Sequence, residues 1–447
     1  MTFPDMQSKS AKLYERAKHV LPWGSSRQAA FFKPYPIYAA FGNGSRVTDV
    51  DGVERIDYVC NYSALMHGHC HPKIVEALRE QAGKLLSIAL PTEAEVRLAE
   101  IVCERMPGIE RIRFCNSGTE GVMFTIKAAR AYTNRPMIAK VEGAYHGSDD
   151  TASISTYPMP DSWGDPDAPD SVPPAGTTRH CAEDVTVIPM NDAEAARRII
   201  SEHRDQLAAV LIDPMVKNLG YEQATPEFVG AIREETSKHG ILLIFDEVYS
   251  FRLGYNGAQG ALGINPDLTA MGKIIGGGLP VGAVGGSAAI MDELFDQRTK
   301  PRLEHSGTFN ANPMTMAAGA AAMHLLTREE FDRVAALGDR ARSGLAEAVK
   351  ISGAKATVRG TTSVIALFHA AADQEMHNYR DIMTVLAQDP GMMERSYKFF
   401  VHMLNNGVLM TPYGFMLLST AMNESDIDVM LEAALSGLRA LKETAAA

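Results

Sequence analysis

The stretch that decides the fold is Ile241-Leu-Leu-Ile-Phe-Asp246-Glu247-Val248. Five apolar residues followed by two carboxylates predict a strand that is buried on both faces and brings an acid to the edge of a sheet. A buried carboxylate is costly without a partner, so Asp246 needs a cationic or proton-donating group beside it. The alternative, which Asp246 taken alone favours, is an acid that caps the following helix.

Strands and helices alternate on both sides of this stretch, which predicts an α/β fold with a mostly parallel sheet and helices on both faces. Short apolar runs at 111–114, 137–141 and 208–212 alternate with helical patterns at 73–86, 92–106, 120–132, 193–206 and 226–238. Polar residues follow each run, including Asn116, Tyr145-His146 and Asp213. Ligands of such sheets bind at the carboxyl ends of the strands, so these residues are expected to share one crevice.

The two ends of the chain have a different character. A helix is expected over 7–20, a loop over 21–36, and a hairpin within 45–60 around Asp51-Gly52. Beyond a helix at 313–327, the pattern predicts a helix at 329–350, strands near 363–369 and 408–419, and a terminal helix at 424–442. We expect a smaller C-terminal α+β domain there.

Composition and charge narrow the classes of function. The 447 residues carry a net charge of −11, which gives no broad basic face for nucleic acid, so small molecules and copies of the chain itself are the expected partners. Five cysteines without a CxxC pair, a start without signal-peptide features and the lack of a membrane-length apolar run predict a cytoplasmic protein. The histidines of His67-Gly-His69-Cys-His71 have no second ligand cluster nearby, so no metal site is expected.

Lys273 lies between apolar neighbours and a run of glycines, in Leu268-Thr-Ala-Met-Gly-Lys273-Ile-Ile-Gly-Gly-Gly278. A partly desolvated lysine has a lowered pKa and can form a Schiff base, whereas an isolated lysine is usually a surface residue. The phosphate-loop and dinucleotide patterns GxxxxGK[ST] and GxGxxG are absent. Asp246 and Lys273, 27 residues apart and joined by a loop and one strand in this interpretation, can lie on opposite sides of a bound pyridoxal-5′-phosphate (PLP) ring, whose protonated nitrogen pairs with an acid.

Two further segments suit the same cofactor. Ser117-Gly118-Thr119-Glu120 begins a helix after a strand, where N–H groups and hydroxyls bind phosphate, although a plain capping box explains these residues equally well. Tyr145 could stack on the cofactor ring, or it is an ordinary half-buried tyrosine.

Five blocks together resemble the class III aminotransferases of PLP fold type I. They are NSGTE at 116–120, EGAYHG at 142–147, IFDEV at 244–248, DLTAMGKIIGGGLPVGAVGG at 267–286 and HSGTFNANPMTMAAG at 305–319. The sequence is most similar to the branch that contains glutamate-1-semialdehyde aminomutase and the β-amino-acid aminotransferases. The resemblance implies a seven-stranded, mostly parallel sheet in a large PLP-binding domain at 66–325. A smaller α+β domain would come from 1–65 and 326–447.

The resemblance also implies roles for individual residues. Lys273 would form the Schiff base and shuttle a proton, and Asp246 would pair with the ring nitrogen. Cofactor contacts are implied for the phosphate residues Ser117, Gly118 and Thr119, the ring-face residues Tyr145 and Val248, and the nearby His146 and Asn218. Thr308 would reach the phosphate of the neighbouring subunit in a homodimer with shared active sites. Arg27 would bind the substrate carboxylate, or it is a solvated loop arginine, and Tyr413 would contact the substrate.

The expected reaction is transfer of an amino group from an amino acid, preferably a β-amino acid, to an oxo acid. The alternatives are an intramolecular aminomutase, a PLP lyase, racemase or decarboxylase, and, with least support, a non-enzymatic binding protein. Three departures from the family pattern leave donor and acceptor open: Asp213-Pro214 in place of Glu-Pro, Tyr413 in place of an arginine, and the extra cation Lys217.

Overall fold

The computed structural model describes residues 2–371, 374 and 376–446. The chain divides into two compact units. The larger unit comprises Lys73–Phe331 and Glu375–Ala387, and the smaller comprises Met1–Pro72, Asp332–Gln374 and Gln388–Ala447. Within the described residues, none of the helices is long and apolar enough to pass through a lipid bilayer.

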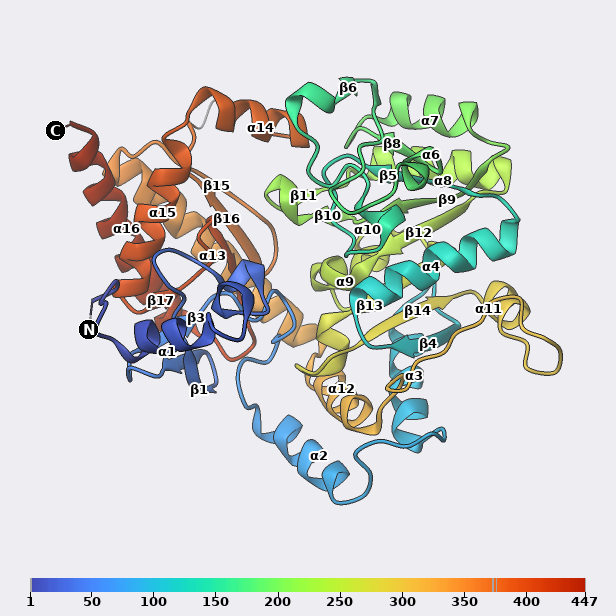
Figure 1. Ribbon diagram of the computed structural model, residues 1–447, viewed down its shortest axis with the longest axis horizontal. Helices are drawn as coiled ribbons and strands as arrows, with labels where there is room; N and C mark the ends of the chain where they lie inside the picture. The colour runs from blue at the N-terminus through green and yellow to red at the C-terminus, as the bar shows by residue number, and fades with distance from the viewer. Residues whose placement is uncertain (1, 372–373, 375, 447) are drawn as a thin grey trace. The chain divides into compact units, whose positions relative to one another are not determined.

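The larger unit is built on the expected seven-stranded sheet (Figure 1). Its strands are, in spatial order, β4 (Arg111–Cys115), β14 (Gly282–Gly286), β13 (Leu268–Gly272), β12 (Leu242–Asp246), β9 (Leu207–Ile212), β5 (Met137–Val141) and β8 (Val185–Ile188). The five strands from β13 to β8 are parallel, and β14 runs antiparallel to both its neighbours. The fold class expected from the sequence is therefore confirmed.

The larger unit also contains α-helices, several of which pack on the sheet. They are α2 (Pro72–Ala82), α3 (Glu93–Arg105), α4 (Gly118–Thr133), α5 (Asp150–Ser153), α6 (Arg179–Glu183), α7 (Ala193–Glu202), α8 (Pro226–His239), α9 (Glu247–Ser250), α10 (Gly257–Leu262), α11 (Ala288–Leu294), α12 (Pro313–Leu325) and α14 (Tyr379–Gln388). Figure 1 shows α7 and α8 side by side near β8 and β9, and α3 and α12 packed together near β4. Every residue of β5, β9, β12, β13 and β14 is buried, which explains why their sequences consist mostly of apolar residues and glycine.

The smaller unit contains two small sheets. One has the order β1 (Ala39–Asn43), β2 (Arg46–Asp49), β3 (Glu54–Asp57) and β17 (Val408–Leu409). The other contains β15 (Thr357–Arg359), β16 (Val364–Phe368) and β18 (Phe415–Leu417). Its helices are α1 (Lys9–Ala17), α13 (Arg328–Ser352), α15 (Met392–Asn405) and α16 (Glu424–Ala446).

The structure corrects the sequence-based assignment at several places. The hairpin around Gly52 is present as β2 and β3, but several elements were not predicted, among them β1, β8, β14, β15, α11, α14 and α15. Strand β14 lacks the usual signal because it is rich in glycine. A Cβ atom added at Gly282 would lie 1.8 Å from the backbone oxygen of Ser117, so this strand needs small residues where the start of α4 packs on it. Between Asp246 and Lys273 lie α9, α10 and β13, not a loop and one strand.

Candidate active site

The centre of the site lies at the carboxyl ends of three adjacent parallel strands, β9, β12 and β13. Phe245 pairs with Ile212, so the next residues, Asp246 and Asp213, lie at equivalent positions on neighbouring strands. Asp246 itself pairs with Ala270, three residues before Lys273. Since neighbouring strands are only about 4.8 Å apart, the sheet brings two acids and one amine to the same edge.

Asp246 is buried and fixed by two hydrogen bonds. Its Oδ1 atom accepts the backbone N–H of Val248 at 3.0 Å, so it caps α9, as the simpler interpretation of the sequence also predicted. Its Oδ2 atom lies 2.8 Å from Nδ1 of His146. Burial lowers the pKa of His146 against the opposing effect of Asp246. The fixed carboxyl of Asp246 therefore faces a buried imidazole.

Asp213 stands beside Asp246 and differs from it electrostatically. Its side chain is buried, and Oδ1 accepts the backbone N–H of Met215 at 3.0 Å. Burial, followed by the neighbouring charge of Asp246, raises the pKa of Asp213 well above its ordinary value. The buried carboxyl of Asp213 therefore favours its protonated form more than an exposed aspartate does.

Lys273 begins the single helical turn η6 (Lys273–Gly276), directly after β13. Its φ of 48° lies in the left-handed region, which costs energy at a residue other than glycine and often marks a functional position. The Nζ atom lies 5.1 Å from the ring centroid of Tyr249. Burial lowers the pKa of Lys273. The charges of Asp246 and Asp213 oppose this effect, and the charge of Lys217 adds to it. The lysine is thus predisposed to act as an uncharged amine.

The start of α4 lies close to these strand ends. Ser117 caps the helix by accepting the backbone N–H of Glu120 at 3.1 Å, while Glu120 Oε2 accepts that of Asn116 at 2.7 Å. A Cβ atom at Gly118 would lie 2.6 Å from Cγ1 of Val248, so only glycine fits between α4 and α9. The first N–H groups of a helix have no partners within it, which leaves this end suited to an anion.

Tyr145 projects from a turn, Glu142–Gly147, that lies between the start of α4 and η4 (Lys217–Leu219). A Cβ atom at Gly147 would lie 2.5 Å from Oγ1 of Thr119, so the turn passes directly beside α4. Asn218 donates from Nδ2 to the backbone oxygen of Gly143 at 3.1 Å. Tyr145 is 50% exposed, and its role as a contact of the cofactor ring stays a prediction.

Thr308 is exposed, in a loop that is tied to the start of α4 through Asn310. Asn116 donates from Nδ2 to Oδ1 of Asn310 at 2.9 Å. The structure thus holds the loop near the predicted phosphate residues of the same chain, while the role of Thr308 toward a neighbouring subunit stays a prediction.

The two predicted substrate residues, Arg27 and Tyr413, belong to the smaller unit. Arg27 is exposed and donates from Nη1 to Oδ1 of Asn61 at 2.7 Å. Burial raises the pKa of Tyr62; the charge of Arg27 opposes this rise and that of Tyr413 adds to it. The side chains of Arg27, Tyr62 and Tyr413 are therefore close to one another. Tyr413 is itself 57% exposed.

Sequence reasoning missed several residues that the structure brings to this site. Tyr249 directly follows the block IFDEV, and its place beside Lys273 could have been inferred from the turn of helix after Asp246. Tyr379 and Arg380 carry no local signal, because their contacts with the turn at 142–147 join distant segments. Lys140 lies only four residues from Ala144, whose backbone oxygen it bonds, but it was not singled out either.

Comparison with known proteins agrees with these observations. A family model described as aminotransferase class-III matches residues 30–432. Glutamate-1-semialdehyde 2,1-aminomutase 2 of Halalkalibacterium halodurans is 37% identical, over 97% of this chain and 99% of that protein. The structure of an omega-transaminase from Sphaerobacter thermophilus is 44% identical with a TM-score of 0.91, covering 98% of each chain. That of a β-phenylalanine aminotransferase from Variovorax paradoxus is 35% identical with a TM-score of 0.84, covering 96% of this chain and 93% of that one.

Proposed function

The chain belongs to the class III aminotransferase family, and from this premise we propose that it moves the amino group of an amino acid through PLP held covalently by Lys273. The observation that carries the proposal is the meeting of a fixed acid, Asp246, and a lysine with a lowered pKa at the ends of adjacent strands. A lowered pKa increases the uncharged fraction of a lysine, and only the uncharged amine attacks a carbonyl group.

PLP is the cofactor of this family, and residues of the larger unit fit it. Its ring nitrogen needs an acid, its phosphate needs N–H and hydroxyl donors, and its aldehyde needs an amine. Asp246, the start of α4 with Ser117 and Thr119, and Lys273 would supply these groups. Among the described residues, Nε2 of His146 is a buried polar atom without a hydrogen-bond partner, which supports a further polar group at this place.

Each residue then has a chemical task. When bound, PLP withdraws electrons from the substrate carbon that loses its proton. Lys273 would take that proton at Nζ and return it to a different atom, a task that its lowered pKa suits. Asp246, held by Val248 and His146, would keep a fixed acid at the ring nitrogen. Tyr145 and Val248 would pack against the two ring faces.

Two specific reactions, amino-group movement within one molecule and transfer between two molecules, use this same chemistry. The name of the curated relative, which is 37% identical, favours an intramolecular aminomutase, the alternative in the sequence analysis, over transfer between two molecules as the main reaction. Asn218, at the position where the aminomutase branch has an asparagine, supports the same reading.

Transfer from an amino acid to a separate oxo acid is the second candidate. It is supported by the 44% identical omega-transaminase and by the β-phenylalanine aminotransferase. The exposed guanidinium of Arg27 would bind the substrate carboxylate, since its planar donors match the two carboxylate oxygens. A β-amino acid is the donor that we propose for this reaction.

The requirement for an acceptor separates the two candidates. The purified holoenzyme is first mixed with single α- and β-amino acids without an acceptor, while its visible absorbance is recorded. Loss of the yellow colour identifies a donor, and turnover that then needs an added 2-oxo acid supports transfer between molecules. Turnover of glutamate 1-semialdehyde without any acceptor supports the aminomutase. Release of ammonia or carbon dioxide, or inversion of the substrate carbon, would contradict both and indicate a lyase, decarboxylase or racemase.

We also propose that two copies of the chain assemble, with Thr308 of each contributing to the phosphate site of the other. The family resemblance and the exposure of Thr308 support this proposal. Substitution of Thr308 by alanine in one of two differently tagged chains tests it. In a mixed dimer, the cofactor should be lost from the site formed by the other chain.

A further inference from the structure

The turn Glu142–Gly147 is fixed at nearly every residue. Lys140 Nζ donates to the backbone oxygen of Ala144 at 3.1 Å, and Thr156 Oγ1 donates to the same atom at 3.2 Å. The contacts of Gly143 with Asn218, His146 with Asp246 and Gly147 with Thr119 fix the rest. Tyr145 is the residue of the turn whose side chain is half exposed. The turn therefore holds the backbone of Tyr145 in place while its ring remains accessible.

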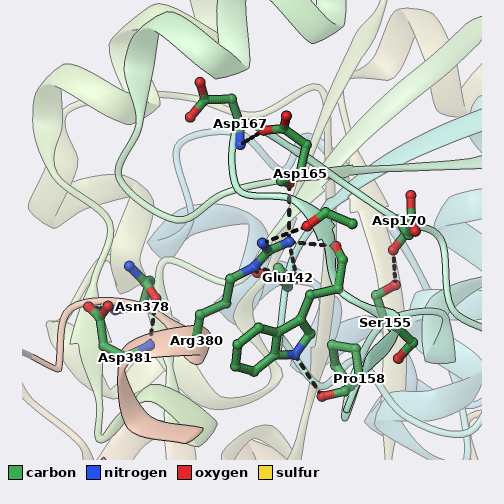
Figure 2. A network of polar contacts seen from close by, with 12 residues as sticks. Glu142, Ser155, Pro158, Asp165, Asp167, Asp170, Asn378, Arg380 and Asp381 are labelled. Carbon is green, nitrogen blue, oxygen red and sulfur yellow. Dashed lines mark hydrogen bonds and ion pairs between the residues drawn. The ribbon is translucent and has the colours of Figure 1, made fainter. Parts of the chain in front are cut away.

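The first residue of the turn, Glu142, is held by an arginine that lies 238 residues further along the chain. Arg380, on α14, donates from Nε to Glu142 Oε2 at 3.0 Å and from Nη2 to Oε1 at 3.1 Å, a two-pronged pair (Figure 2). Both side chains are nearly buried, with 14% and 5% exposure. Since two parallel hydrogen bonds fix orientation as well as distance, Arg380 sets the direction in which Glu142 points.

The remaining donors of Arg380 hold a second segment. Its Nη1 and Nη2 atoms donate to the backbone oxygens of Gly164 at 3.1 Å, Trp163 at 2.6 Å and Asp165 at 3.2 Å (Figure 2). The guanidinium carbon also lies 5.4 Å from the centroid of the Trp163 ring. Arg380 therefore joins the turn to β6 (Gly164–Asp165) and to Trp163, the residue before it.

Its neighbour Tyr379 makes α14 complementary to the next residue of the turn. A Cβ atom at Gly143, whose φ is +76°, would lie 2.5 Å from Cδ2 of Tyr379. Because a larger residue cannot enter this space, α14 and the turn fit together at both Glu142 and Gly143. Burial raises the pKa of Glu142, while Arg380 and then Lys140 oppose this effect, so the acid is compensated from two sides.

We propose that Arg380 is a positioning residue of the active site, which acts through Glu142 to hold Tyr145 and His146 against the cofactor. The inference rests on the proposed function, because it gives α14 a task only if PLP binds beside this turn. A positioning role differs from a purely structural one in its effect on the bound cofactor: the loss of Arg380 should disturb PLP even when the protein remains folded.

Three variants and one control test the inference. R380M removes the two-pronged pair, R380K keeps the charge without the fork, and E142Q keeps the shape of the acid but weakens its pairing. The control is R395M, because Arg395 forms a similar two-pronged pair with Asp389 in the smaller unit, at 3.1 and 2.6 Å. The measurements are the rate at which the purified holoenzyme loses PLP during dialysis, its visible absorbance spectrum, and the melting temperature.

R380M should lose PLP at least tenfold faster than the natural protein, which corresponds to about 1.4 kcal/mol in the activation free energy of release, and its absorbance maximum should shift. R380K and E142Q should show intermediate effects. R395M should lower the melting temperature without changing PLP release or the spectrum. If R380M fails to fold, R380K and E142Q decide the outcome.

Release and spectra that stay unchanged in R380K and E142Q, or changes as large in R395M, would overturn the role of Arg380. A natural protein that binds no PLP would instead overturn the proposed function, so the two failures are distinguishable.

Discussion

The turn Glu142–Gly147 and the loop around Arg27 illustrate two ways to present a functional side chain. In the turn, Glu142 and His146 are buried with 4% and 2% exposure, and separate hydrogen bonds hold them. Arg27 is exposed, and the hydrogen bond that it makes with Asn61 lies at the surface. The contrast teaches that groups expected to serve a constant cofactor are fixed by burial, whereas a group expected to meet a variable substrate keeps its freedom.

The largest effect is expected from Lys273→Ala, which removes the amine at the centre of the fixed region. Loss of a general acid–base group alone costs roughly 10²–10⁴-fold, and loss of covalent attachment adds to it. The rate with the best amine donor and the yellow absorbance of the holoenzyme measure the effect. Lys127→Ala, on the exposed face of α4, is the control. Retention of activity in the Lys273 variant would refute the central assignment.

Arg27→Ala tests whether the exposed arginine binds the carboxylate of the substrate. A hydrogen bond to a charged group contributes about 1.5–3 kcal/mol, so KM for a carboxylate-bearing donor should rise roughly 10- to 100-fold. PLP affinity and the rate with an amine that lacks a carboxylate should stay constant, and Arg27→Lys should restore part of the loss. An equal effect on both kinds of donor would argue against carboxylate recognition.

His146→Phe tests whether the buried hydrogen bond between His146 and Asp246 contributes to catalysis. The change removes the hydrogen bond to Asp246 and should lower the free energy of unfolding by about 1–3 kcal/mol. The value of kcat should also fall, since Asp246 loses one of its two fixed contacts. The matched control is His69→Phe, because His69 pairs with Asp57 at the same 2.8 Å. Equal losses of kcat in both variants would remove the distinction between the two histidines.

The last prediction concerns stability alone and the buried Lys140, whose pKa burial lowers to about 7. In the unfolded chain the pKa is near 10.4, so between these values the unfolded state binds more protons and stability rises with pH. The cost of burying the ammonium group is thus full below pH 7 and disappears above pH 10. Urea unfolding at pH 6.5 to 9.5 should show this rise, and Lys140→Met should flatten it. Lys350→Met, at an exposed position, should leave the slope unchanged.

Local sequence patterns were informative where one segment supplied the whole signal. The apolar run that ends at Asp246 predicted a buried strand, and the register of β9, β12 and β13 brings its acid to the same edge as Lys273. Patterns failed where a neighbour dictates the residue type. The glycines of β14 hid a strand because the start of α4 packs against them. The roles of the individual site residues stay predictions.

By itself, the sequence determined the α/β class and the strand ends where an acid and an amine would meet, because hydrophobic periodicity and strand-end residues are local properties of the chain. Only the tertiary structure decided that His146 faces Asp246, that Tyr249 lies beside Lys273, and that Arg380 holds Glu142. These contacts join segments between 24 and 238 residues apart. They depend on how the helices and strands pack in three dimensions, which cannot be inferred from the spacing of residues along the chain.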